Sequence, residues 1–257
     1  MKTVYGPVSS WRLGKSLGVD LICSKEKICS FNCKYCQLGN KGIKTKKRKE
    51  FIQIKQIKTD VSKALKLTNP DVITFSGTGE TTLASNLYSA VNTIRKLIDL
   101  PIAILTNSSM MNIDDVGNTL EKFDIVVAKL DASNQKIFEK INQPVNNILL
   151  DDIVDGIKKF KKNFSGKLSI QIMFTDDNIA IVDDLVKILE NINPDEVQIN
   201  TPLRSCPVKP LTKDQINFIE AKFNFVGLNT ISVYKSYKPR TKTLDKMEVF
   251  FRRKTDS

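Results

Sequence analysis

Histidine is absent from the 257 residues, which excludes Ser-His-Asp triads, Cys-His proteases, His-ligated zinc sites and His general bases. Chemistry must therefore come from Cys, Lys, Asp, Glu, Tyr or a cofactor. Glycine (11) and proline (9) are few, which argues against low-complexity sequence. No apolar stretch of about 18 residues occurs, and the first ten residues contain no apolar signal core, so we expect a cytoplasmic protein without a membrane span. In that compartment, five cysteines act as ligands or reactive thiols more readily than as disulfides.

The composition is that of a folded protein with a strong positive charge. Hydrophobic residues make up 41% and charged residues 26%. Lys and Arg number 40 against 28 Asp and Glu, so the formal charge is 40 − 28 = +12. This charge suggests a polyanionic partner such as a nucleic acid, and a Lys-rich bias of the whole proteome is the alternative explanation. Six basic residues lie in Lys41–Lys49, and eight, against two acidic ones, lie in Lys235–Lys254. We expect one domain over residues 1–257, with its core at about 6–233 and a weakly ordered basic tail at 235–257.

Short β-branched apolar runs alternate with amphipathic stretches along the chain. The expected strands are 18–22, 71–75, 101–106, 124–130, 167–174, 196–200 and 229–233, and the expected helices are 83–98, 113–122, 133–141, 149–161, 179–191 and 212–223. Strands that are apolar on both faces and separated by helices indicate a parallel sheet. About six such units in this length favour a partial (β/α)6 barrel, with a doubly wound open sheet as the alternative. In both folds, functional groups gather at the carboxyl ends of the strands.

Cys29, Cys33 and Cys36 form a C-x3-C-x2-C triplet. Three thiolates within eight residues can converge on one metal centre from a tight loop, and thiolates favour iron–sulfur clusters or zinc. With three protein ligands, a four-iron cluster keeps one iron open to an external ligand, which is typical of a catalytic site. The alternative is a structural zinc site of four cysteines that includes Cys23.

A second motif, Phe75-Ser-Gly-Thr-Gly-Glu80, directly follows an expected strand. Two glycines at the carboxyl end of a strand let a ligand approach the backbone closely. The carboxylate of Glu80 suits a cationic group such as an amine. A plain strand-to-helix turn is the alternative interpretation of this motif by itself.

Together these residues resemble the radical S-adenosylmethionine (SAM) superfamily. The resemblance rests on Cys29, Cys33 and Cys36, on Tyr35 just before the last cysteine, and on Gly77-Thr-Gly-Glu80 after a strand. More narrowly, four segments resemble a group of uncharacterised Fe–S oxidoreductases that is similar to the wyosine-tRNA synthases: Tyr5–Asp20, Cys36–Gly39, Leu105–Asn107 and Lys129–Ala132. Those synthases bind a second cluster through three further cysteines ahead of the main motif, whereas here only Cys23 precedes it.

The resemblance implies that Cys29, Cys33 and Cys36 bind a [4Fe–4S] cluster whose fourth iron is chelated by SAM. It places Gly77, Thr78, Gly79 and Glu80 along the methionine part of SAM, with Glu80 near the amine, and Tyr35 near the adenine. It further implies that an electron from a reductant protein such as flavodoxin or ferredoxin cleaves SAM to methionine and a 5′-deoxyadenosyl radical, which abstracts a substrate hydrogen.

Four further residues are candidates for this site. Lys129 and Asp131 alternate along an expected strand end, so they face one side, where Asp131 would bind the ribose of SAM and Lys129 its carboxylate or the substrate. Asn107, after the preceding strand, is a similar candidate. Cys206 lies beyond another strand end and is a candidate for a catalytic or substrate-contacting thiol. Cys23 is interpreted as a small buried hydrophobic side chain, or alternatively as a thiol near the cluster.

Two other functional classes share these motifs. An activating enzyme, which generates a glycyl radical on a partner protein, has the same cysteine spacing. A non-catalytic module that binds a cluster or zinc is the third class. The sequence does not identify the substrate.

Overall fold

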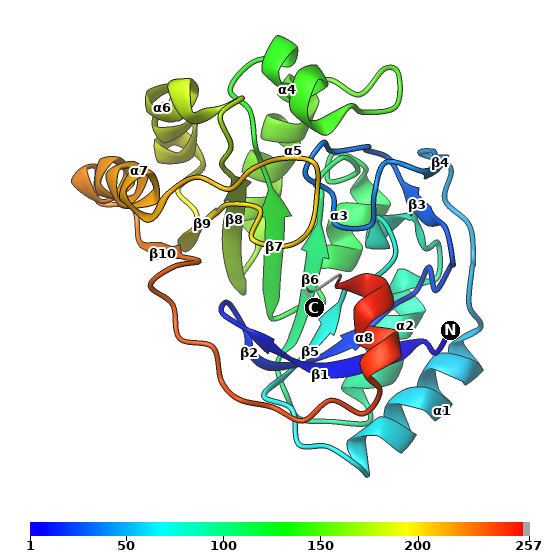
Figure 1. The fold of residues 1–257 in the computed structure, drawn as a ribbon. Coiled ribbons are helices and arrows are strands. Elements are labelled where there is room, and N and C mark those ends of the chain that lie inside the picture. The colour runs from blue at the N-terminus through cyan, green and yellow to red at the C-terminus, as the bar shows by residue number, and fades with distance from the viewer. Residues whose placement is uncertain (254–257) are drawn as a thin grey trace.

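The computed structural model describes residues 1–253, and its main feature is a curled eight-stranded sheet (Figure 1). The strands are β1 (Val4–Ser10), β2 (Gly14–Val19), β3 (Lys27–Cys29), β4 (Gly42–Lys44), β5 (Val72–Phe75), β6 (Ile102–Thr106), β7 (Ile125–Lys129), β8 (Lys167–Met173), β9 (Glu196–Asn200) and β10 (Thr230–Ser232). The α-helices are α1 (Ile54–Leu65), α2 (Leu87–Arg95), α3 (Asp114–Leu120), α4 (Gln135–Asn142), α5 (Leu150–Asn163), α6 (Val182–Ile192), α7 (Lys213–Phe225) and α8 (Lys246–Arg252), and two short 3-10 helices are η1 (Thr81–Leu83) and η2 (Ile179–Ile181).

The sheet has the order β1-β2-β5-β6-β7-β8-β9-β10, and all neighbours except β1 and β2 are parallel. Six strand–helix units run from β2 to α7, and helices cover the outer face of the curved sheet (Figure 1). The strands β5 (VITF) and β6 (IAILT) are mainly apolar and almost wholly buried, as expected for strands of a parallel sheet. This architecture confirms the predicted partial barrel and excludes the doubly wound alternative.

Every strand and helix expected from residue 71 onward is present, with ends shifted by four residues or fewer. The capping box at Thr212 is also formed, with the hydroxyl of Thr212 accepting from the backbone N–H of Gln215. The expected first strand at 18–22 is wrong, because β2 begins at Gly14 and pairs with the earlier strand β1 as an antiparallel hairpin. Polar residues such as Lys15 and Ser16 hide this strand from a search for apolar runs.

The expected weak order of the segment after Val233 is also wrong for its described part. This segment crosses the open side of the sheet and ends in α8, which packs against β1 (Figure 1). Asp245 caps α8 by accepting from the backbone N–H groups of Met247 and Glu248. Helix α1 was not predicted, although Ile57, Val61 and Ala64 bury one face of it at helical spacing. No helix in residues 1–253 is long and apolar enough to cross a membrane.

Candidate functional site

Cys29 is the last residue of β3, and Cys33 and Cys36 lie in the loop that follows it, at the carboxyl end of the barrel. The backbone N–H of Cys36 donates to the carbonyl oxygen of Cys33 over 3.0 Å, which closes a turn inside the loop. Lys34 donates its backbone N–H to the last turn of α4, at the carbonyl oxygen of Ile141 (2.9 Å). The loop is thus held at both its own turn and at α4. All three cysteines are free thiols and only partly exposed.

Amide groups from two other elements point at the sulfur atoms. The side-chain amide of Asn107, after β6, lies 3.5 Å from Sγ of Cys29, and the amide of Asn142, at the end of α4, lies 3.4 Å from Sγ of Cys33. The backbone N–H of Phe31 also donates to Cys29. Such donors stabilise negative charge on sulfur. Asn142 was missed by sequence reasoning because nothing in the sequence around a helix end links it to a cysteine about 110 residues away.

The electrostatics of the thiols suit ligation to a positively charged centre. Burial, the charge of Asp131 and that of Cys36 raise the pKa of Cys33 to about 11, against the hydrogen bond from Asn142. Burial and the charges of Glu80 and Cys33 raise the pKa of Cys29 still more strongly. Thiolates are the ligating form, so iron would supply the positive charge that these sites lack. Among residues 1–253, no group of three Cys, Asp or Glu side chains has the arrangement of metal ligands.

The glycine motif lies directly beside the cysteine loop. The backbone N–H of Glu80 donates to the carbonyl oxygen of Ile28 (3.0 Å), and the N–H of Ile28 donates to that of Thr78 (3.1 Å). A Cβ on Gly79 would stand 1.6 Å from the oxygen of Ile28, and one on Gly77 2.0 Å from the carboxyl carbon of Asp20. The glycines are therefore required by close approach within the protein, a reason different from the ligand approach predicted from the sequence.

Glu80 is buried, and protein donors take most of its carboxylate. Oε1 accepts from the backbone N–H of Thr82 (3.1 Å), its hydroxyl (2.7 Å) and the hydroxyl of Thr106 (2.6 Å), while Oε2 accepts from the backbone N–H of Asn107 (2.7 Å). Burial raises the pKa of Glu80, and these hydrogen bonds oppose the rise. Oε1 thus accepts from three donors and Oε2 from one, so Oε2 is the oxygen with room for a further donor.

Lys129 and Asp131 face the same side, as predicted, with Nζ of Lys129 3.3 Å from Oδ1 of Asp131. Asp131 is buried and also accepts from the hydroxyl of Tyr35, the amide of Asn142 (2.7 Å) and the backbone N–H of Met173 (2.7 Å). The Lys129 ammonium lies 4.9 Å from the ring centre of Tyr35, a cation–π distance. The Tyr35 side chain is therefore fixed between these two residues.

A cavity of about 420 Å³ opens beside this site, in the mouth of the barrel. Tyr35, Cys36 and Lys129 form part of its wall. Asn107 lies instead against the sulfur of Cys29. The structure does not bring Cys206 into the wall, because its thiol turns to the carbonyl oxygen of Val208 (3.3 Å).

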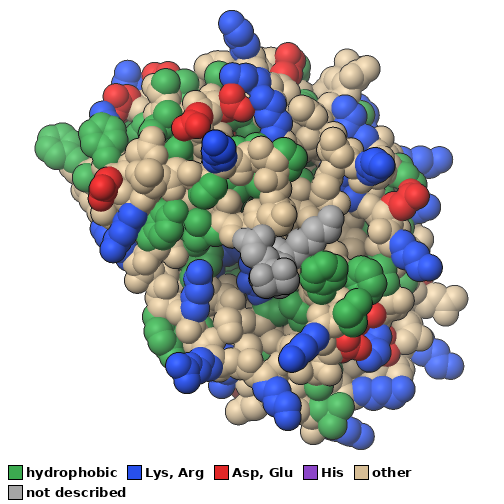
Figure 2. Space-filling model, in the orientation of Figure 1, with side chains coloured by type: hydrophobic (Ala, Val, Ile, Leu, Met, Phe, Trp, Pro, Cys, Tyr) green, Lys and Arg blue, Asp and Glu red, His purple; other side chains and the backbone are tan. Residues whose placement is uncertain are grey.

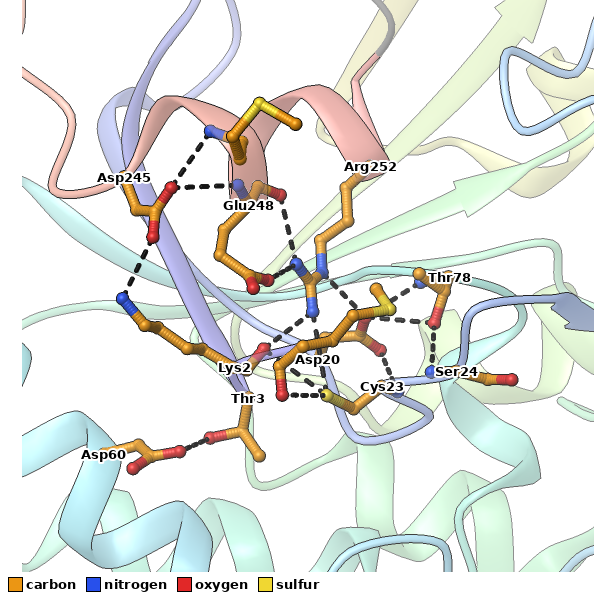
Figure 3. Close-up of polar contacts among 12 residues, drawn as sticks. Lys2, Thr3, Asp20, Cys23, Ser24, Asp60, Thr78, Asp245, Glu248 and Arg252 are labelled. Carbon is orange, nitrogen blue, oxygen red and sulfur yellow. Dashed lines mark hydrogen bonds and ion pairs between the residues drawn. The ribbon is translucent and has the colours of Figure 1, made fainter.

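A buried polar cluster on the other side of the glycine motif ties it to the C-terminal helix (Figure 3). Asp20 accepts from the backbone N–H (3.1 Å) and hydroxyl (3.0 Å) of Thr78 and forms an ion pair with Arg252 of α8, Nε to Oδ2 2.8 Å. Cys23 lies in this cluster, with Sγ 3.4 Å from the carbonyl oxygen of Lys2 and 3.8 Å from Arg252. Cys23 is thus not a hydrophobic core residue, contrary to the prediction.

Comparison with known proteins gives one family. The model of the "Radical SAM superfamily" matches residues 27–200, which include both motifs. A UPF0026 protein of Methanocaldococcus jannaschii is 37% identical over 248 residues, which are 93% of this chain and 76% of that protein. A UPF0026 protein of Synechocystis is 37% identical over 225 residues, 87% of this chain and 82% of that protein. A GTPase Obg of Brachyspira hyodysenteriae is 36% identical over 207 residues, 79% of this chain but 30% of that protein.

Solved structures share the fold at low sequence identity. Streptococcus suis SuiB bound to S-adenosylmethionine superposes with a TM-score of 0.64 at 16% identity, covering 83% of this chain and 50% of that one. A radical SAM methyltransferase from Sphaerobacter thermophilus gives 0.64 at 14% identity, covering 85% and 66%. The chain therefore spans about half of SuiB and two thirds of the methyltransferase.

Proposed function

Because the chain belongs to the radical SAM superfamily, whose members use a [4Fe–4S] cluster and SAM, we propose that it cleaves SAM reductively to activate a substrate hydrogen. The observation that carries this proposal is the contact between the two motifs. The strand that leads into Cys29 is hydrogen-bonded to the loop that carries Glu80, with Glu80 N to Ile28 O at 3.0 Å. A cluster on the cysteines and an amine beside Glu80 would then be neighbours.

We assign the cluster to Cys29, Cys33 and Cys36, whose burial and amide donors suit bound thiolates. When bound and reduced, the cluster supplies the electron that splits SAM into methionine and a 5′-deoxyadenosyl radical. Asn107 and Asn142 direct their amides at sulfur, which favours the more negative, reduced state. Reduction requires a partner, for which we propose flavodoxin or ferredoxin.

We assign each of the remaining residues either to direct contact with SAM or to positioning a residue that makes such a contact. Gly77, Thr78, Gly79 and Glu80 would bind the amino-acid part of SAM, and the free acceptor position on Oε2 of Glu80 supports a contact to its amine. The hydroxyl of Tyr35 is already bonded to Asp131, which leaves its ring and backbone for the adenine.

Protein donors also surround Asp131, so we assign it a positioning role, in contrast to the ribose contact that the resemblance implies. Lys129 reaches the cavity and is the candidate for the carboxylate of SAM or for the substrate. Cys206, outside the cavity wall, is a weaker candidate for catalysis.

The charge of the protein supports a polyanion such as tRNA as a second partner. Lys and Arg outnumber Asp and Glu on the face seen in Figure 2. The basic segment Lys41–Lys49 is mostly exposed, and its strand β4 pairs with β3 beside the cysteine loop. Part of this segment is structural, since Arg48 binds the carbonyl oxygen of Thr82 and the carboxylate of Asp115.

The proposal is tested by anaerobic reconstitution with iron and sulfide, followed by incubation with SAM and dithionite. We expect methionine and 5′-deoxyadenosine from the unaltered protein. Cys29→Ala, Cys33→Ala and Cys36→Ala should each lose the cluster absorbance and the cleavage. Cys206→Ala and Cys23→Ala are the matched controls and should keep both. If Cys23→Ala loses as much iron as Cys33→Ala, the three-cysteine assignment is wrong.

A further inference from the structure

Three arginines from distant parts of the chain meet in the wall of the barrel cavity. Arg12 lies in the turn between β1 and β2, Arg204 follows β9, and Arg253 follows the last residue of α8. All three line the 420 Å³ cavity that contains Cys36 and Tyr35. They also line a smaller neighbouring cavity of about 210 Å³ that reaches Gly77 and Gly79. Neither wall contains an Asp or Glu among the described residues.

The contacts of these arginines are with neutral groups. Arg204 donates to the side-chain oxygen of Gln37 (2.5 Å), and Arg253 donates to the carbonyl oxygen of Ser9 (3.3 Å). Arg12 lies 5.4 Å from the ring centre of Trp11, and its buried Nε has no hydrogen-bond partner within the described structure. In residues 1–253, none of the three forms an ion pair with a carboxylate.

This arrangement is electrostatically unfavourable without a ligand. Burial, followed by the charges of Arg253 and Arg12, lowers the pKa of Arg204 to about 9. Burial, followed by the charge of Arg253, lowers the pKa of Arg12 to about 10. Burying charge without a partner costs free energy, and buried charges in proteins are ordinarily paired. The protein therefore holds a charge of about +3 in a partly desolvated wall, and an anion would relieve it.

We propose that Arg12, Arg204 and Arg253 bind a phosphate group of the substrate, an assignment that rests on the proposed function of the neighbouring cysteines. A phosphate carries up to two negative charges and several acceptor oxygens, which suits three guanidinium groups better than a single carboxylate does. Because Cys36 shares the same wall, a molecule held at the arginines extends toward the cluster. The phosphate belongs either to a small phosphorylated molecule or to a nucleotide of an RNA.

The direct test uses inorganic pyrophosphate as the probe and the full chain with its cluster loaded. Isothermal titration calorimetry gives the dissociation constant. Trp11 is the single tryptophan of the chain and lies in the cavity wall, so a change in its fluorescence places the probe in this cavity. Arg204→Gln and Arg12→Gln should each weaken binding about tenfold or more. The matched control, Arg240→Gln, removes an exposed arginine outside both walls and should leave binding unchanged.

Further arms keep the result interpretable if a variant is damaged. Arg204→Lys retains the charge without the planar fork and should recover part of the affinity, and retained cluster absorbance shows that each variant is folded. S-adenosylhomocysteine has a carboxylate and no phosphate. If Arg204→Gln weakens its binding and not that of pyrophosphate, the arginines serve the cofactor and the proposal is overturned.

The two sources of phosphate give different outcomes. If the substrate is a small molecule, total tRNA should leave pyrophosphate binding unaffected. If the substrate is an RNA, total tRNA should compete with pyrophosphate, and Arg204→Gln should weaken the binding of tRNA. The proposed site is refuted if pyrophosphate leaves the fluorescence of Trp11 unchanged, or if it binds equally tightly to Arg204→Gln and Arg240→Gln. SAM cleavage is recorded separately, so its absence in a protein that binds pyrophosphate refutes the proposed reaction and not the anion site.

Discussion

Replacing Arg252 with methionine removes the cation that pairs with Asp20, whose carboxylate also accepts hydrogen bonds from Thr78 of the glycine motif. The guanidinium of Arg252 is 1% exposed and lies 4.8 Å from the ring centre of Tyr5. It pairs with Asp20 (2.8 Å) and Glu248 (2.6 Å) and donates to the carbonyl oxygen of Lys2 (2.7 Å) (Figure 3). The substitution therefore leaves Asp20, itself 1% exposed, as a buried negative charge with no cation.

The structure allows an estimate of the loss. Breaking a buried ion pair by removing one partner costs about 3–5 kcal/mol. Asp20 keeps four neutral donors, the backbone N–H groups of Ile22, Cys23 and Thr78 and the hydroxyl of Thr78. The lower value of about 3 kcal/mol is therefore expected for the free energy of unfolding. With a urea m-value of about 3 kcal/mol/M, the midpoint falls by about 1 M.

Urea unfolding followed by circular dichroism measures this change. Lys246→Ala alters an exposed residue of the same helix and serves as the control. The double variant Asp20→Asn with Arg252→Met removes both charges, and its loss should be about 2 kcal/mol smaller than the sum of the single losses. The reasoning is refuted if Arg252→Met costs no more than Lys246→Ala, or if the two single losses add.

Three further predictions concern the site and its partners. Asn142→Ala removes an amide donor from the sulfur of a cluster ligand and should lower the reduction potential of the cluster, as measured by a redox titration followed by electron paramagnetic resonance; an unchanged potential contradicts the assigned contact. Gly79→Ala would place a Cβ 1.6 Å from the oxygen of Ile28 and should displace β3 and abolish SAM binding, whereas Gly117→Ala, with its nearest neighbour at 3.7 Å, should retain it. If Lys41–Lys49 and the C-terminal basic residues bind tRNA through about five phosphate contacts, log K should fall with log salt concentration at a slope of roughly −3.5; a dissociation constant no tighter than about 10⁻⁴ M at physiological salt counts against an RNA partner.

The features that the sequence predicted are those with a local signal. The strand β9 was predicted with its observed ends because Glu196–Asn200 is a short segment with alternating Val and Ile between two amphipathic helices. The cysteine triplet spans eight residues, so its shared loop follows from covalent connection alone. Lys129 and Asp131 were placed on one side by the alternation of a strand, and the structure places them 3.3 Å apart.

Features that depend on tertiary contacts were missed or misread. Strand β1 has the partly polar pattern of a hairpin, and a search for wholly apolar strands passes over it. The helix α8 looks like a basic tail, because only the contact with Asp20, 232 positions away, shows why Arg252 is buried. The need for glycine at position 77 likewise has a cause that only the fold shows, because the carboxylate of Asp20 occupies the space of the missing Cβ.

The positions of the basic residues matter more than their number. From the sequence, Lys41–Lys49 was predicted to bind a polyanion because its basic residues are contiguous. This segment is mostly exposed, and ion pairs formed by exposed side chains contribute little free energy in water. Arg12, Arg204 and Arg253 stand alone in the sequence and meet only when β1, the loop after β9 and the end of α8 surround one cavity. Each of these charges attracts a bound anion more strongly than an exposed lysine does, because the surrounding protein screens the charge less than water does. The selectivity of the enzyme for its substrate should therefore depend on these three residues, and salt-sensitive encounter on the exposed segment.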